Sequence, residues 1–138
     1  MTTESTASRL RRRPLGSTGL QVSEIGFGAW AIGGGACVQG RPFGYGTTDD
    51  AQSLAALARA FELGVNFVDT ADAYGMGHSE RLIGKAIKAS PRRVHLATKV
   101  GTVRRDPELP RKDFSPEYIR EACDRSLSRL GVTCIDVY

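Results

Sequence analysis

The sequence predicts an α/β protein whose parallel strands follow the path of a (β/α)8 TIM barrel, and three observations support this fold class. Short apolar runs alternate with amphipathic segments of helical period, which is typical of parallel strands joined by crossover helices. Gly26 and Gly28 lack the third glycine that a doubly wound nucleotide-binding fold places before its first helix. Asp69 and Lys99 each end a predicted strand, where barrel enzymes carry their catalytic groups.

The chain begins with a polar segment and a predicted hairpin. Residues 1–8 are small and polar, so we expect a disordered tail there and one domain over residues 9–138. Gly16 and Gly19 lie between two short extended runs, which indicates a hairpin. The strand expected at Glu24–Trp30 alternates glycine with larger residues. This pattern is typical of a strand that faces a crowded centre or a ligand.

Strands and helices then alternate to the end of the sequence. In order, we expect a glycine-rich loop at Ala31–Thr47, a helix capped by Thr47 or Thr48 and ended by Gly64, a strand ending at Asp69, a helix at Ser79–Lys88, a strand at Val94–Val100, a polar loop at Gly101–Phe114, a helix from Ser115 to Gly131 and a strand at Thr133–Tyr138. This order corresponds to a hairpin, roughly the first three βα units and a fourth strand of a barrel.

The composition excludes several classes of function. The net charge is only +4, with basic and acidic residues interspersed, so we expect no nucleic-acid partner. The three cysteines include no C-x-x-C pair and only two histidines are present, so neither a metal site nor a disulfide framework is expected. No apolar run approaches the ~18 residues of a membrane span. We therefore expect a cytoplasmic protein without a membrane partner.

Asp69, Tyr74 and Lys99 form a candidate catalytic group. A carboxylate at the end of a buried strand needs a cation nearby, and Lys99 at the end of the next strand supplies one. A cation within about 4–6 Å of a tyrosine favours its charged form, so Lys99 is expected to make Tyr74 a better proton donor. Such a donor suits a carbonyl oxygen that receives negative charge. No nucleophile is well placed, so a hydride would come from a cofactor.

The motifs closely resemble those of the aldo-keto reductases. They are R-P-L-G-S-T-G-L-Q-V-S, G-F-G-A-W, D-T-A-D-A-Y-G, G-H-S-E-R-L-I-G, A-T-K-V-G and D-R-S-L-S-R-L-G-V-T-C-I-D-V-Y, spread over residues 9–138. The resemblance implies an NADP-dependent oxidoreductase that binds NADPH, less often NADH, and reduces a small aldehyde or ketone.

The resemblance also implies roles for individual residues. Asp69, Tyr74 and Lys99 match three members of the family's catalytic tetrad of Asp, Tyr, Lys and His, with Tyr74 as general acid. Gly28, Trp30 and Asp69 match positions near the cofactor, although a lone tryptophan such as Trp30 is equally compatible with core packing.

The tetrad histidine has no counterpart here, because in the family it lies just beyond the D-V-Y on which this sequence stops. His78 is instead predicted to be a helix-entry residue, and His95 a hydrogen-bonded core residue. We therefore expect the chain to represent the N-terminal half of a barrel, without strands five to eight or the phosphate-binding loops, and to be inactive alone. Two alternatives remain: a non-catalytic binding or regulatory subunit, and an inactive truncated half-barrel. The sequence does not predict an oligomeric state.

Overall fold

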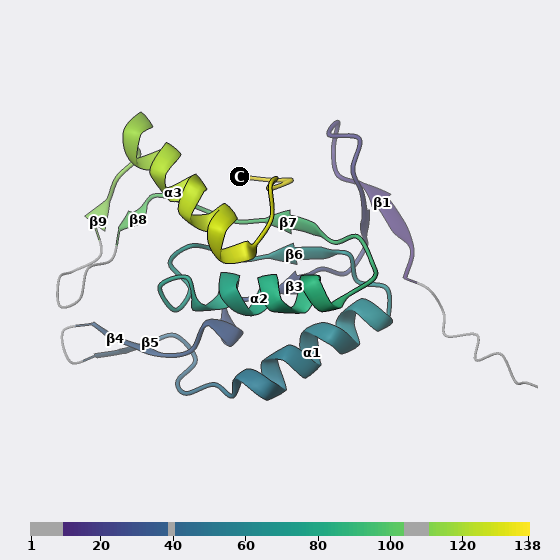
Figure 1. Ribbon diagram of the computed structural model, residues 1–138, viewed down its shortest axis with the longest axis horizontal. Coiled ribbons are helices and arrows are strands. Elements are labelled where there is room, and N and C mark those ends of the chain that lie inside the picture. The colour runs from purple at the N-terminus through teal and green to yellow at the C-terminus, as the bar shows by residue number, and fades with distance from the viewer. Residues whose placement is uncertain (1–9, 39–40, 104–110) are drawn as a thin grey trace, which may run out of the picture.

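A computed structural model describes residues 10–38, 41–103 and 111–138. Figure 1 shows a small sheet covered by helices, with hairpins at its two ends. The central elements are the strands β3 (Phe27–Gly28), β6 (Phe67–Asp69) and β7 (His95–Ala97) and the helices α1 (Asp50–Glu62), α2 (His78–Ala89) and α3 (Pro116–Leu130). The predicted tail, residues 1–8, lies outside the described residues.

The central sheet is parallel, in the order β3-β6-β7. Val68 pairs with Phe27 on one side and with Leu96 on the other. The predicted strand Thr133–Tyr138 takes the next place in the sheet, where Val137 forms a single parallel bridge with Ala97 instead of a longer ladder. The sheet is therefore built in the order that a parallel barrel requires, and its described strands do not close on themselves.

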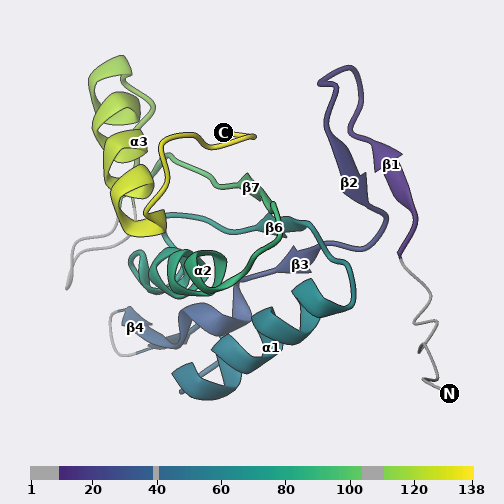
Figure 2. The same cartoon turned by 45° about the vertical axis from the view of Figure 1, so that its right-hand side comes forward.

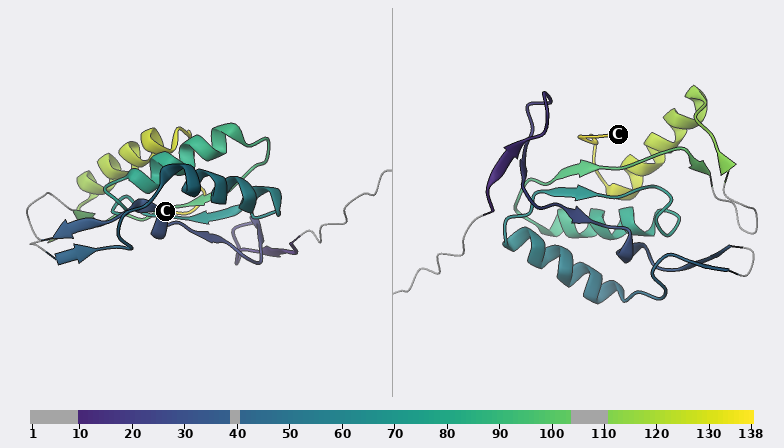
Figure 3. Two further views of the ribbon diagram at one scale, coloured as in Figure 1. Left: turned by 90° about the horizontal axis from the view of Figure 1, so that it is seen from below. Right: turned by 180° about the vertical axis from the view of Figure 1, so that it is seen from behind.

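The three α-helices cover one face of this sheet (Figures 2 and 3). Their apolar stripes meet Val68 of the central strand in a core whose largest fully buried side chains include Leu57, Leu82, Ile83 and Leu130. Burying side chains of this size contributes about 1.5–3 kcal/mol each. The helical layer thus fixes the strands, and the strands fix the residues that follow them.

The helix ends follow the expected chemistry with one difference. Ser115 caps α3 through a hydrogen bond from the Tyr118 amide, and Gly131 ends that helix at φ 67°. The cap of α1 is Asp49, whose carboxylate accepts from the Gln52 amide, and not Thr47 or Thr48. A carboxylate at this position accepts a hydrogen bond from the free amide, and its negative charge suits the positive end of the helix dipole. A neutral hydroxyl lacks that charge.

Short hairpins flank the sheet. The predicted N-terminal hairpin is present as β1 (Arg12–Pro14) and β2 (Gln21–Ser23), and Asn66 at the start of β6 ties it down through three hydrogen bonds of 2.6–3.0 Å. The opposite end carries β4 (Ala36–Val38) with β5 (Arg41–Phe43), and β8 (Thr102–Val103) with β9 (Arg111–Lys112), as Figure 1 shows.

The hairpins β4–β5 and β8–β9 stand where the sequence predicted irregular loops. The turn of 3-10 helix η1 (Ala31–Gly33) also lies within the first of these loops. Both hairpins follow carboxyl ends of central strands, so they extend the edge of the sheet at which the candidate site was predicted.

Candidate active site

The register of the sheet brings the predicted site residues to one edge. Gly28 pairs with Asp69, and Asp69 pairs with Ala97, so three strands end at the same level. The amide of Ala29 donates to the carbonyl oxygen of Asp69 at 2.8 Å, which continues this register past the strand ends. Trp30 and Lys99 follow these ends by two residues each. Parallel strands therefore place side chains far apart in the sequence on one rim.

The Lys99 ammonium has an acceptor for each of its three protons. Nζ donates to Asp69 Oδ2 at 2.8 Å, to the carbonyl oxygen of Thr70 at 2.7 Å and to Tyr74 Oη at 3.3 Å. The predicted proximity of Asp69, Tyr74 and Lys99 is thus present. The Asp69 and Lys99 side chains are 44% and 49% exposed, so a small molecule in solution has access to the pair.

Tyr74 is held in place by its main chain. Its amide donates to the carbonyl oxygen of Ala71, in a tight turn that continues into α2. Gly33 lies directly against this turn, because a Cβ atom built on Gly33 would stand 2.9 Å from the carbonyl carbon of Tyr74 and 3.1 Å from the Gly75 nitrogen. A side chain at Gly33 would therefore displace the tyrosine.

Aromatic rings line the approach to the phenol. Trp30 stacks on Tyr74 with ring centroids 6.0 Å apart and planes inclined by 23°. Tyr45 meets Trp30 edge to face at 5.1 Å. Trp30 is 40% exposed and Tyr45 is 65% exposed, so neither is a core residue. In the described residues the two rings form a flat apolar wall beside Tyr74, and the role of Trp30 stays a prediction.

The sequence did not reveal two of these groups. Tyr45 lies in a loop that contains no catalytic motif, and only the turn after β5 brings it to Trp30. Thr70 contributes a main-chain carbonyl, which every residue has, so no sequence pattern distinguishes it. The signal that was available is the position of Thr70 directly after the strand-ending Asp69.

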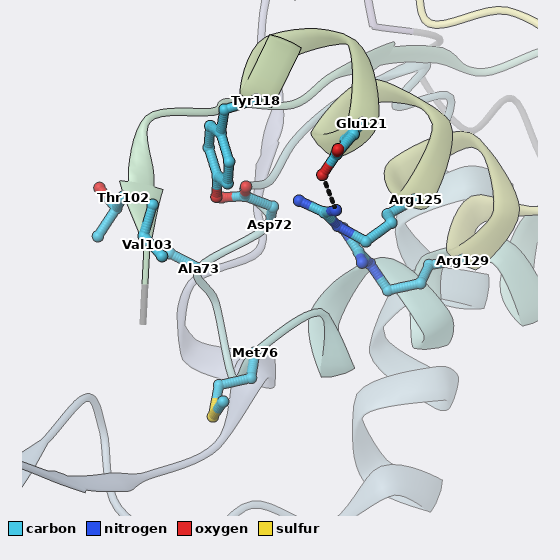
Figure 4. A pocket seen from close by; sticks show the side chains of 9 residues that line it. All are labelled: Asp72, Ala73, Met76, Thr102, Val103, Tyr118, Glu121, Arg125 and Arg129. Carbon is cyan, nitrogen blue, oxygen red and sulfur yellow. Dashed lines mark hydrogen bonds and ion pairs between the residues drawn. The ribbon is translucent and has the colours of Figure 1, made fainter. Parts of the chain in front are cut away.

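A hollow of about 360 Å³ lies beside this site, between the turn after β6 and α3 (Figure 4). In Figure 4 the Asp72 carboxylate lies next to the Tyr118 hydroxyl, and the ion pair of Arg125 with Glu121 also lines the hollow. Partial burial, with the charge of Glu80 nearby, raises the pKa of Asp72. Burial and the charge of Asp72 likewise raise the pKa of Tyr118. These groups do not contact the Lys99 ammonium.

Neither histidine belongs to the candidate site, and each is bonded to an aspartate elsewhere in the fold. His78 begins α2 as predicted, and its Nε2 lies 2.7 Å from Asp50 Oδ1. His95 is buried, and its Nδ1 is 3.1 Å from Asp136 Oδ1, which confirms the prediction of a hydrogen-bonded core histidine. Neither ring contacts Tyr74 or Lys99 among the contacts of the described residues.

Within the described parts of the chain, no three His, Cys, Asp or Glu side chains are grouped so that they could bind a metal ion. None of the described helices has the length and apolar character needed to span a bilayer.

Known proteins match both the sequence and the fold. Residues 24–138 match the model of the aldo/keto reductase family. The "NADH-specific methylglyoxal reductase" of Escherichia coli is 38% identical over 140 residues, which cover 94% of this chain and 41% of that protein. The chain spans about two-fifths of the length of the curated relatives it matches.

Solved structures agree. The holo form of an aldo-keto reductase from Bacillus halodurans superimposes with a TM-score of 0.77 at 35% identity, over 92% of this chain and 38% of that one. An aldo/keto reductase from Klebsiella pneumoniae in complex with NADP and acetate gives a TM-score of 0.60 at 26% identity, over 85% and 34% of the two chains. The predicted fold class is confirmed: the described residues are part of a parallel α/β barrel.

Proposed function

Because this chain belongs to the aldo/keto reductase family, we propose that the protein containing it reduces the carbonyl group of a small aldehyde or ketone with a nicotinamide cofactor. The observation that carries the proposal is the Lys99 ammonium, which contacts Asp69, the Thr70 carbonyl and the Tyr74 phenol at once. Oxidoreductase chemistry follows from the family. The substrate class, the cofactor and the residue roles are our proposal.

Tyr74 is proposed as the proton donor. The carbonyl oxygen of a substrate gains negative charge as hydride adds to the carbonyl carbon, and a phenol at hydrogen-bond distance stabilises that charge and then releases its proton to it. The ammonium of Lys99, 3.3 Å from the phenol oxygen, stabilises the phenolate that remains. Asp69 and the Thr70 carbonyl hold this ammonium in one orientation, so the charge is in place before the reaction begins.

The residues around the rim fit a flat nicotinamide ring. A Cβ atom built on Gly28 would meet nothing within 4 Å, so there is open space above the strand end that pairs with Asp69. The stacked rings of Trp30 and Tyr74, which follow β3 and β6 at this edge of the sheet, offer aromatic faces to such a ring. A bound nicotinamide would supply the hydride. Gly28, Trp30 and Asp69 are accordingly the proposed cofactor-binding residues of this chain.

We propose NADPH as the preferred cofactor, with NADH as the alternative. The Klebsiella relative binds NADP, whereas the Escherichia coli relative is NADH-specific, so the relatives do not decide between them. The groups that discriminate the two cofactors contact the ribose phosphate, far from the nicotinamide. Tyr74, Lys99 and Asp69 have the same role with either cofactor.

The test is a reductase assay of the complete reading frame that encodes this chain. We expect oxidation of NADPH or NADH that depends on methylglyoxal or a simple aldehyde, and a loss of at least about 100-fold in kcat for Tyr74→Phe. Cofactor affinity should change little, because the phenol acts on the transition state. Tyr118→Phe is the matched control, since Tyr118 lies in the neighbouring hollow.

Two results would contradict the proposal. Cofactor binding without turnover on any carbonyl would favour a non-catalytic binding or regulatory subunit. Near-normal turnover in Tyr74→Phe would show that another group protonates the substrate.

A further inference from the structure

Two consecutive residues at the start of α2, Ser79 and Glu80, are completely buried although both are polar. A buried hydroxyl or carboxylate is costly unless it is hydrogen-bonded. Each of these side chains makes two hydrogen bonds, and every partner belongs to a different element from α2. They therefore connect α2 to its surroundings and do not serve the helix itself.

Ser79 links the ends of β3 and β6. Its Oγ donates to the carbonyl oxygen of Ala29 at 2.9 Å, and it lies 2.9 Å from Thr70 Oγ1. A carbonyl oxygen can only accept, so the single proton of Ser79 is committed to Ala29. The Thr70 hydroxyl must then donate to Ser79. This order of donors fixes Thr70, whose carbonyl oxygen accepts a hydrogen bond from the Lys99 ammonium.

Glu80 links the end of β7 to α3. Its Oε1 accepts from Thr98 Oγ1 at 2.7 Å, and its Oε2 accepts from Arg129 Nε at 2.5 Å. Arg129 is itself anchored to Ser126 at 3.1 Å. Thr98 precedes Lys99, so this second set of bonds fixes the main chain from which the lysine side chain extends.

We propose that Ser79 and Glu80 are positioning residues for the Lys99 ammonium. Ser79 fixes the position of Thr70, whose carbonyl oxygen accepts from the ammonium. Glu80 fixes Thr98 and thereby the main chain from which the Lys99 side chain extends. Among the contacts of the described residues, neither side chain bonds to Tyr74. The carbonyl oxygen of Tyr74 accepts from the Ser79 amide at 3.3 Å, a main-chain bond that Ser79→Ala leaves in place. The kinetic part of this inference rests on the proposed reductase function, whereas the positioning itself can be measured without any activity.

The structural test measures how fast Lys99 is acylated by an amine reagent in the folded protein encoded by the complete reading frame. Lys85 and Lys88 are exposed and act as internal references. Loss of the side-chain bond that fixes the Thr70 carbonyl should loosen the hold on the ammonium and raise the labelling of Lys99 about two- to fivefold relative to them. We expect this for Ser79→Ala and for Thr70→Val, which removes only the hydroxyl. Double substitution should add little, because both variants break the same bond.

Ser53→Ala is the matched control. Ser53 is also a buried helical serine, but its hydroxyl bonds, among the residues that the structure describes, only to the carbonyl oxygen of Asp49 in its own helix cap. We expect it to change stability and not Lys99 labelling. Thr98→Val tests the Glu80 half separately, because it leaves the ion pair with Arg129 in place.

The outcomes separate the two proposals. Wild-type labelling of Lys99 in folded Thr70→Val protein overturns the role of Ser79, and wild-type labelling in Thr98→Val overturns that of Glu80, whether or not the protein is a reductase. If labelling rises, kcat should fall about three- to tenfold while KM for the carbonyl stays constant. Raised labelling with unchanged kcat would overturn the kinetic part. Raised labelling in a protein without any turnover would overturn only the proposed function.

Discussion

Two contacts between a carboxylate and a basic side chain lie at opposite ends of β7. At the carboxyl end, Lys99 pairs with Asp69, and both side chains are nearly half exposed, at 49% and 44%. At the amino end, His95 pairs with Asp136, and these side chains are only 10% and 14% exposed. The first pair opens toward a tyrosine and a stack of aromatic rings. The second is enclosed where β7 meets the segment that takes the place of the fourth strand.

The difference lies in where the acceptors are directed. Both oxygens of Asp136 serve the fold, since Oδ2 accepts from the Leu96 amide at 2.9 Å and Oδ1 lies beside His95. Asp69 and Thr70 instead direct their oxygens at one ammonium on the solvent side of the sheet. An exposed pair contributes little to stability, whereas a buried hydrogen-bonded carboxylate contributes more. We infer that the amino-end pair stabilises the sheet and the carboxyl-end pair serves chemistry.

The largest effect that this comparison predicts is that of replacing Lys99. Replacing it by methionine removes the charge that we propose stabilises the phenolate of Tyr74, and we expect turnover to fall about 1000-fold. The unfolding free energy should change by less than about 1 kcal/mol, because the lost pair is half exposed. Steady-state kinetics and urea unfolding measure the two quantities. Lys85→Met is the control. A large loss of unfolding free energy that accompanies the fall in turnover would show that Lys99 is mainly structural.

The opposite result is expected for Asp136→Ala. This change leaves the Leu96 amide and His95 without their acceptor, so we expect a loss of about 2 kcal/mol in unfolding free energy at neutral pH, with turnover within about twofold of the parent. Turnover reduced in a folded Asp136→Ala protein at low temperature would contradict the assignment.

The effect of Asp136 should also depend on pH. Partial burial acts to raise its pKa, but the hydrogen bonds from the Leu96 amide and His95, with the charges of His95 and Arg93, outweigh this and lower the pKa. A carboxyl group whose pKa is lowered by folding stabilises the folded state above its unfolded pKa of about 3.9, and this is lost as the pH falls through the folded value. The stabilities of parent and variant should therefore converge in acid.

The sequence predicted those parts of the molecule that depend on local patterns. The hairpin at Gly16 and Gly19, the three helices, the strand ending at Asp69 and the strand two residues before Lys99 follow from turn residues and from the spacing of apolar residues. The meeting of Asp69 with Lys99 was predictable because successive parallel strands end at the same edge of a sheet, and because a charge there needs a partner.

The remaining features depend on contacts between distant segments. The segment Ala31–Thr47 is rich in glycine, which predicts an irregular loop and not the hairpin that is present. The position of Tyr45 beside Trp30 was therefore not predicted either. The sequence predicted Ser79 only as the start of a helix. It did not predict the bond from the Ser79 hydroxyl to the carbonyl oxygen of Ala29, which lies 50 residues earlier. No periodic pattern encodes such a bond, and the same holds for the main-chain acceptor at Thr70.

The smallest expected effect sharpens the comparison with a third carboxylate, that of Asp72. It lies next to the rim but faces the neighbouring hollow, and burial together with the charge of Glu80 raises its pKa. A carboxyl group whose pKa is raised by folding favours the folded state below its unfolded pKa of about 3.9 and opposes it once the pH passes the folded value. Its dependence on pH is thus opposite to that of Asp136.

Asp72→Asn should therefore stabilise the protein slightly at neutral pH, by at most about 0.5 kcal/mol because the group is partly exposed. The gain should disappear as the pH falls through the folded pKa, where the parent carboxyl is already neutral. Urea unfolding of both proteins between pH 3 and pH 8 would measure this, with turnover at neutral pH as a second readout. A stability gain that persists unchanged in acid would mean that the amide makes a new contact, and that the raised pKa of Asp72 is not its cause.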